Sequence, residues 1–359
     1  MAFSVLGMLH RLFRKNDDVK LIFQEYKKIF ATIGLLMAAV FVSALTSGFI
    51  EEGLKSFLHK YIGHVVIMLP VLLIFDKKRI LILAKLLLTG IFFSNLIVVG
   101  QGLIHFDEVW RFGGMIKGSQ IAVVLPVYAA LIMCTEHKRI LIFGAFVGFG
   151  ALIFNGTRGV WLSSLFLVPA VIFICAKNKL KSFGVVVLIL AIVGGIFAST
   201  PNLSERFSSI TNLQMQSNAE RLLIWESSFN MFADNPILGV GYGQYKNAYQ
   251  NKYISAEAKE HHLDHAHNNI IQMLAECGIV GASAFMFMWL YFSYFSLKEW
   301  FKNRKIEWLL FFCVLSGIML HGLTEFNFET STTAKILWYS LGLCTAYSRQ
   351  KSFGSSNNF

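Results

Sequence analysis

Charged residues are scarce in this sequence. Asp, Glu, Lys and Arg make up 15% of its 359 residues, hydrophobic residues make up 55%, and the mean hydropathy is +0.57. A soluble globular protein needs a more polar surface than this composition provides, so that class is excluded. Apolar runs long enough to cross a hydrocarbon core of about 30 Å recur along almost the whole chain, and they are continuous instead of alternating. We therefore predict an all-α integral membrane protein and not a barrel.

Cysteines and acidic residues are also few. The five cysteines lie within or beside apolar runs and none forms a CxxC pair, so we expect neither a disulfide framework nor a zinc site built on them. The net charge is +11, but the basic residues cluster between apolar runs, where they set topology and contact anionic membrane lipids. No basic-aromatic module is present, so nucleic acid is not an expected partner.

Ten apolar runs are predicted to form transmembrane helices. They are Ile29–Ile50, Tyr61–Phe75, Ile80–Gly100, Ser119–Cys134, Ile140–Phe154, Val160–Ala176, Phe183–Ser199, Asn269–Leu297, Ile306–Leu320 and Ala334–Tyr347. Basic clusters occupy every second loop, so the positive-inside rule places both termini in the cytoplasm. The predicted domains are an amphipathic cytoplasmic N-terminus (1–28), helices one to seven (29–199), a large periplasmic loop subdomain (200–268), helices eight to ten (269–347) and a cytoplasmic tail (348–359).

Four polar residues stand out on the predicted outward side. They are Arg111, Arg158, Arg221 and His267. An arginine at the end of a span can simply extend its guanidinium to the membrane interface. Because all four residues are expected on the same side, we favour a shared functional site.

The order of these motifs resembles the O-antigen ligase family, the WaaL-like members of the O-antigen ligase and polymerase superfamily. Arg158 followed by Leu162 fits an R-x-x-x-L pattern, and His267-Asn268 followed by Gly278 fits an H-[NSQ]-x9-[GS] pattern. The stretches 220–225 (ERLLIW), 235–243 (NPILGVGYG) and 265–268 (HAHN) are similar as well. The resemblance covers Arg111 to the C-terminus. Family members often have more spans, so a helix pair at the N-terminus is expected to be absent here.

The resemblance implies a GT-C-like bundle in the bacterial inner membrane with an inverting glycosyltransferase activity. The donor would be a glycan on undecaprenyl diphosphate and the acceptor the lipid A-core, without nucleotide sugar, cofactor or metal. Guanidinium groups match phosphate oxygens, so Arg158 and Arg221, with Arg111 as a third candidate, are expected to hold the diphosphate. A neutral imidazole can accept the proton of the acceptor hydroxyl, which makes His267 the candidate general base.

Several alternatives stay open at these positions. His267 could instead cap the helix that begins near Asn269. Glu325 could orient His267 or an arginine, or it could be a solvated residue of an acidic turn, while His265 and Asn268 are further supporting candidates. A zinc or manganese site is also conceivable, and its ligands would come from His261, His262, Asp264, His265 and His267.

Other features allow a second reading too. Aromatic residues between Trp225 and Tyr249 could stack on sugars or form a local core, and the glycines from Gly239 to Gly243 predict a tight turn, not a nucleotide loop. A polymerase or a protein O-oligosaccharyltransferase of the same superfamily would act on a different acceptor. A transporter of lipid-linked glycans needs charges at mid-membrane depth, which the predicted spans largely lack.

Overall fold

The computed structural model describes residues 16–74, 76–106 and 111–354, which form helices joined by turns and loops, with no strand among them. This confirms the all-α prediction. The helices in chain order are α2 (Asn16–Glu25), α3 (Lys27–Thr46), α4 (Ile50–Ser56), η1 (Phe57–Ile62), α5 (Gly63–Val65), α6 (Met68–Leu72), α7 (Lys77–Ile104), α8 (Gly118–Ile121), α9 (Val124–Cys134), α10 (Lys138–Asn155), α11 (Arg158–Cys175), α12 (Lys179–Ser199), α13 (Pro201–Ser208), α14 (Gln216–Asp234), α15 (Tyr245–Ala248), η2 (Tyr249–Tyr253), α16 (Asn269–Asn303), α17 (Ile306–His321) and α18 (Ser331–Gly354).

Several of these helices fit a multi-pass membrane protein. Within the described residues, six are long and apolar enough to cross a membrane, namely α3, α7, α10, α11, α12 and α16, and the apolar stretches Gly118–Cys134 and Ile306–His321 are shorter. The count of ten spans stays a prediction. The predicted single helix Tyr61–Phe75 is wrong in detail, because η1, α5 and α6 divide its described part into short pieces; Phe75 itself lies outside the described residues.

The two predicted cytoplasmic ends lie partly outside the described residues. Where the structure describes them they are helical, since α2 and the start of α3 fall within residues 1–28. At the other end, α18 continues to Gly354, beyond the predicted end of the last span.

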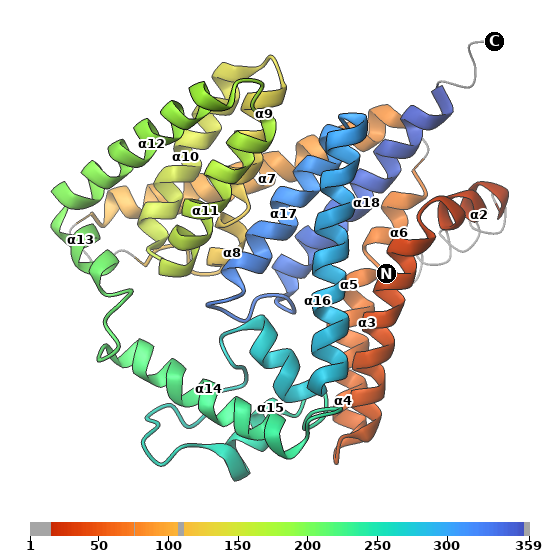
Figure 1. Cartoon of the computed structure of the whole chain (residues 1–359), viewed down its shortest axis with the longest axis vertical. Helices are drawn as coiled ribbons and strands as arrows, with labels where there is room; N and C mark the ends of the chain where they lie inside the picture. The colour runs from red at the N-terminus through yellow and green to blue at the C-terminus, as the bar shows by residue number, and fades with distance from the viewer. Residues whose placement is uncertain (1–15, 75, 107–110, 355–359) are drawn as a thin grey trace.

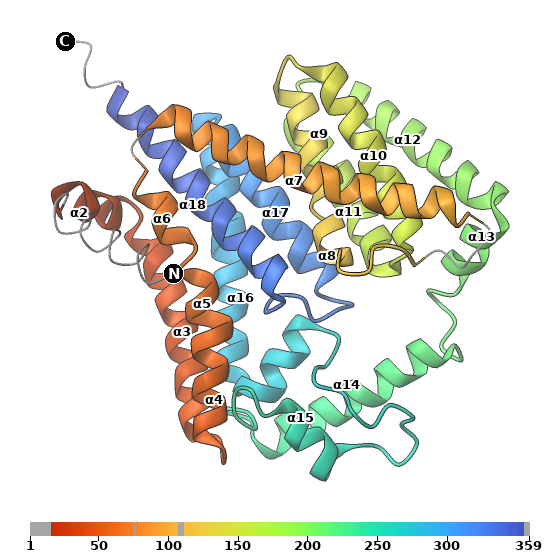
Figure 2. The same cartoon turned by 180° about the vertical axis from the view of Figure 1, so that it is seen from behind.

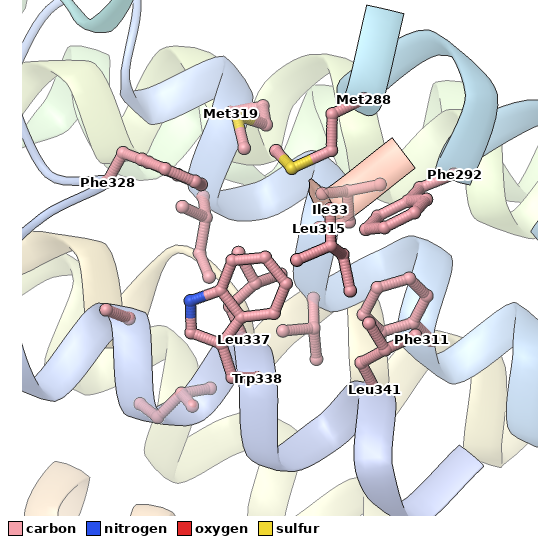
Figure 3. Close-up of a cluster of buried hydrophobic side chains, with 14 of the residues drawn as sticks. Ile33, Met288, Phe292, Phe311, Leu315, Met319, Phe328, Leu337, Trp338 and Leu341 are labelled. Atoms are coloured by element: carbon pink, nitrogen blue, oxygen red, sulfur yellow. The ribbon is translucent and has the colours of Figure 1, made fainter. Parts of the chain in front are cut away.

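Helix α16 is the centre of one group of helices. It packs against α3 and α17, and α17 packs against α18. Helices α9 to α12 form a second group, and α7 crosses both (Figures 1 and 2). Figure 3 shows Ile33 of α3, Phe292 of α16, Leu315 of α17 and Trp338 of α18 meeting in one apolar cluster. Within a membrane such close packing, more than removal from water, holds helices together.

A break in α16 receives the glycine-rich segment that follows α14. Gly278 has φ +60°, which interrupts the helical hydrogen bonds at that point. Gly239, Gly241 and Gly243 also have positive φ, so the predicted tight turn is confirmed. Four backbone hydrogen bonds join the two segments: Val240 N to Ala275 O (2.9 Å), Gly241 N to Glu276 O (3.0 Å), Ile279 N to Pro236 O (2.9 Å) and Val280 N to Ile237 O (3.3 Å).

The polar segment 200–268 has an apolar core of its own. This core joins side chains of α14, α15 and η2 to Ala266 and to the first turns of α16. Tyr242, Tyr245 and Tyr249 are fully buried, so the sugar-stacking hypothesis is wrong for these three residues. Because α16 also belongs to the helix bundle, this core fixes the loop before α16 against the rest of the protein.

Candidate active site

A polar cavity of about 440 Å³ lies where the ends of α11, α16 and α17 meet α13 and α14. The residues Arg111, Arg158, Arg221 and His267 all line it, and so does Glu325. The structure thus brings together side chains from five separate parts of the sequence.

His267 and Glu325 form a hydrogen-bonded pair in this cavity. His267 Nδ1 lies 2.8 Å from Glu325 Oε1. Burial raises the pKa of Glu325, but hydrogen bonds from His265 and His267 outweigh burial and hold that pKa well below its ordinary value of 4.5. An ionised carboxylate only accepts hydrogen bonds, so Nδ1 of His267 carries a proton; in a neutral imidazole the lone pair is then on Nε2. Among the described residues, Nε2 of His267 has no hydrogen-bond partner.

The backbone around His267 is held in an unusual conformation. His267 has φ +50°, a left-handed value that is uncommon outside glycine. On its N-terminal side, Ala266 N donates to Gln272 Oε1 (2.7 Å) and Ala266 O accepts from Trp225 Nε1 (3.0 Å). These bonds fix the direction in which the imidazole leaves the chain.

Asn268 is the N-cap of α16. Its Oδ1 accepts from the backbone N–H groups of Ile270 (2.8 Å) and Ile271 (3.1 Å), so the hypothesis that His267 caps this helix is wrong. The Nδ2 of Asn268 donates to Leu323 O (2.8 Å), which ties the start of α16 to the turn that carries Glu325.

Glu325 contacts three of the predicted residues. Besides His267, its carboxylate lies 3.3 Å from His265 Nε2 and 3.8 Å from Arg221 Nη2. The alternative of a solvated acidic turn is therefore wrong for Glu325. The Nδ1 atom of His265 also lies 2.5 Å from Oδ1 of Asp264. Burial lowers the pKa of His265, but its bonds to Glu325 and Asp264 outweigh burial and raise the pKa above 6.5.

Three of these side chains could hold a metal ion. Among the described residues, ligand atoms of His265, His267 and Glu325 all lie within 4.8 Å of one another, and imidazole and carboxylate are zinc ligands. The hydrogen bonds to Glu325 account for the same contacts without a cation. His262 does not join this group, since its Nδ1 lies 2.8 Å from Gln250 Nε2.

Arg158 is the first residue of α11, and the loop between α13 and α14, together with the first turn of α14, holds it. Its Nη1 donates to the backbone oxygen of Ser209 (2.7 Å). Its Nη2 donates to Ser217 Oγ and to Asn218 Oδ1, both at 2.9 Å. Most of the hydrogen-bonding capacity of this guanidinium is therefore directed at the protein.

Sequence reasoning missed Arg206, which lies on α13 and lines the same cavity. Its Nε donates to Gly156 O at 2.6 Å, next to the start of α11. Burial and the nearby charges of Arg111 and Arg158 lower the pKa of Arg206 to about 10. No motif marks this position, and the one signal in the sequence is a basic residue in an amphipathic stretch of the polar loop.

His321 at the end of α17 carries no motif either. It lines the cavity, yet only 2% of the residue is exposed. The amide Nδ2 of Asn327 donates to His321 Nδ1 (3.0 Å), so Nε2 carries the proton, and within the described part of the chain it has no acceptor.

Known families include one that is similar to the part of the chain around this cavity. The family model described as "O-Antigen ligase" matches residues 143–286, from α10 into α16. This part of the chain is similar to the O-antigen ligase family. Arg158, Arg221 and His267 lie inside the matched region, whereas Arg111 and Glu325 lie outside it.

Curated relatives bear similar names. The chain is 27% identical over 195 residues to a Rickettsia conorii protein named "Putative polysaccharide ligase". The match covers 50% of this chain and 43% of the relative. It is 33% identical over 153 residues to a Rickettsia typhi protein of the same name, covering 40% of this chain and 36% of the relative. The chain thus matches less than half the length of these relatives.

Proposed function

We propose that this protein is an O-antigen ligase, a metal-independent inverting glycosyltransferase of the bacterial inner membrane. It moves a polysaccharide from undecaprenyl diphosphate to the lipid A-core on the periplasmic face, as a step of lipopolysaccharide biosynthesis. The observation that carries the proposal is a histidine–glutamate pair that shares one cavity with a cluster of arginines, in and beside the region similar to the O-antigen ligase family.

The cavity offers a base for the acceptor. The acceptor hydroxyl attacks the anomeric carbon of the donor while the bond between that carbon and the diphosphate oxygen breaks. The proton of the hydroxyl passes to Nε2 of His267, and the electron pair of the broken bond stays on the diphosphate oxygen. Glu325 orients the imidazole through Nδ1 and stabilises the imidazolium that forms. Attack from the side opposite the diphosphate inverts the anomeric centre.

The arginines stabilise the negative charge of the leaving group. Arg111, Arg158 and Arg221 line the cavity and give it positive charge. A diphosphate gains negative charge as it departs, so cations fixed around it lower the barrier without a metal ion.

Replacing His267 with Ala tests the proposal. We expect purified protein with lipid-linked donor and rough lipopolysaccharide, in the presence of a chelator, to lose activity by about 10²-fold or more, because a general base contributes roughly that factor. A cooperative thermal unfolding transition of the variant would show that the activity is lost without loss of the fold. His262→Ala is the matched control, since His262 is exposed in the same loop and should keep full activity.

Undiminished ligation by the His267→Ala variant would overturn the role of this residue. Activity that disappears with chelator and returns with zinc would instead favour a metal held by His265, His267 and Glu325. In cells, loss of a ligase leaves lipid A-core without O-antigen, whereas loss of a polymerase leaves one attached repeat. This pattern separates the ligase from the polymerase of the same superfamily.

A further inference from the structure

Arg158 and Arg206 meet at the same turn between α10 and α11 but use their guanidinium groups differently. Both Nη groups of Arg158 donate to the loop of Ser209, Ser217 and Asn218. Arg206 donates to the protein only through Nε, to the backbone oxygen of Gly156. Among the described residues, the two Nη groups of Arg206 have no hydrogen-bond partner.

The loop held by Arg158 is a closed network. Asn218 accepts from Arg158 through Oδ1, and its Nδ2 donates to the backbone oxygens of Ser209 (2.9 Å) and Asn212 (2.8 Å). Ser209 O therefore accepts from both Arg158 and Asn218. This network joins the end of α13 to the start of α14, the helix that carries Arg221 into the cavity.

We propose that Arg206 contacts the diphosphate of the donor directly, and that Arg158 is a positioning residue that holds the Ser209–Asn218 loop. This assignment rests on the proposed function, which requires a diphosphate in the cavity. Arg158 adds charge to the site, and its hydrogen bonds organise the wall from which Arg206 and Arg221 reach the ligand.

The electrostatics of the cavity support this division. Arg206 lies near Arg111 and Arg158, and cations gathered in this way repel one another until an anion binds between them. The carboxylate of Glu325 is already engaged by two histidines and Arg221. Glu220 accepts from the backbone N–H groups of Lys259 and Glu260. A guanidinium with both Nη groups available fits a phosphate through two parallel hydrogen bonds.

Binding of farnesyl diphosphate, a soluble polyprenyl diphosphate, to the purified full chain in detergent tests the assignment. We expect Arg206→Gln to weaken affinity about 10-fold or more, as for the loss of hydrogen bonds to a charged group, with thermal stability close to that of the parent. Lys117→Gln is the matched control, because it removes the same charge from an exposed position in the same cavity. Its effect should be clearly smaller. Arg206→Lys should retain the fold and recover only part of the affinity.

A variant that keeps Arg158 distinguishes a positioning role of this residue from direct contact with the ligand. Asn218→Ala should lower both affinity and thermal stability in the manner of Arg158→Gln. An Asn218→Ala protein with parental affinity, beside an Arg158→Gln protein that has lost it, would show that Arg158 touches the ligand and overturn its positioning role. Equal effects of Arg206→Gln and Lys117→Gln would overturn the contact with Arg206. Arg221→Gln tests the proposed function itself. If neither Arg206→Gln nor Arg221→Gln weakened affinity, the proposal of a diphosphate donor would be wrong.

Discussion

At His265, two carboxylates oppose the effect of burial, and stability should depend on pH as a result. The pKa of His265 is raised above 6.5, so its ionic contacts contribute fully below that pH and are lost as the pH rises through the raised pKa. The pKa of Glu325 is lowered from 4.5, so its contribution is present above 4.5 and is lost only in strong acid. We expect the thermal unfolding temperature to be higher at about pH 6 than at about pH 8.5.

His265→Gln should flatten this dependence, because an amide side chain does not titrate in that interval. Thermal unfolding of the detergent-solubilised chain at both pH values measures the difference. His262→Gln is the control, since it removes an exposed histidine from the same loop and should keep the slope of the parent. A slope that is the same in the His265→Gln variant would contradict the assignment.

At this scale the sequence predicted which residue types belong to the site and not how they pair. Sequence motifs predict Arg111, Arg158, Arg221 and His267 as site residues, and all four line one cavity. The partners of Arg158 lie 51 to 60 residues away, and only the folded loop brings them to it. Arg206 carries no motif, and its place depends on the packing of α13 onto Gly156. Long-range contacts of this kind leave no local signal.

At the scale of one element, the break in α16 depends on Gly278. A Cβ at this position would lie 2.4 Å from the carbonyl carbon of Ile237, and the φ of +60° with ψ −161° belongs to a region that only glycine enters readily. We expect Gly278→Ala to destabilise the protein by roughly 1–3 kcal/mol or more, and to reduce ligation because α16 begins next to His267. Thermal unfolding and the ligation assay measure both effects.

Gly184→Ala on α12 is the matched control, because a Cβ there would meet nothing within 4 Å. It should leave stability unchanged or slightly raised, since alanine favours helix more than glycine does. Equal stability of the two variants would show that the break in α16 tolerates a side chain.

Helix positions followed from apolar periodicity, but helix breaks did not. Continuous hydropathy predicts the run Asn269–Leu297 as one span, but the structure breaks it at Gly278, where the segment Pro236–Gly241 docks. The run Tyr61–Phe75 was predicted as one helix and is divided instead. In α16 the backbone bonds to a distant segment, whereas in the second run it changes to local turns, with Ile67 N donating to His64 O and Leu69 N to Val66 O. Hydropathy reports burial in an apolar medium and carries no information on either.

Across the whole molecule, the cavity and the basic clusters lie at opposite ends of the helices. Helix α10 begins at Lys138 and ends at the cavity residue Asn155, and α17 begins after Lys305 and ends at His321. At about 1.5 Å per residue, the 18 residues of α10 span about 27 Å, close to the thickness of the hydrocarbon core. The arrangement of the helices, with α7 crossing both groups, could not be predicted, because nearly featureless apolar surfaces specify no neighbour.

This polarity of the molecule allows its orientation to be tested by thiol labelling. Lys302 is exposed near the end of α16 in a basic cluster, and His262 is exposed in the loop that faces the cavity end. Since basic clusters stay in the cytoplasm, a membrane-impermeant maleimide should label His262→Cys in intact spheroplasts and Lys302→Cys only after the membrane is opened. The native protein, whose five cysteines are buried or half-buried, gives the background. The reverse pattern would place the cavity in the cytoplasm, where an O-antigen ligase could not reach its acceptor, and labelling of His267→Cys from both faces would favour a transporter.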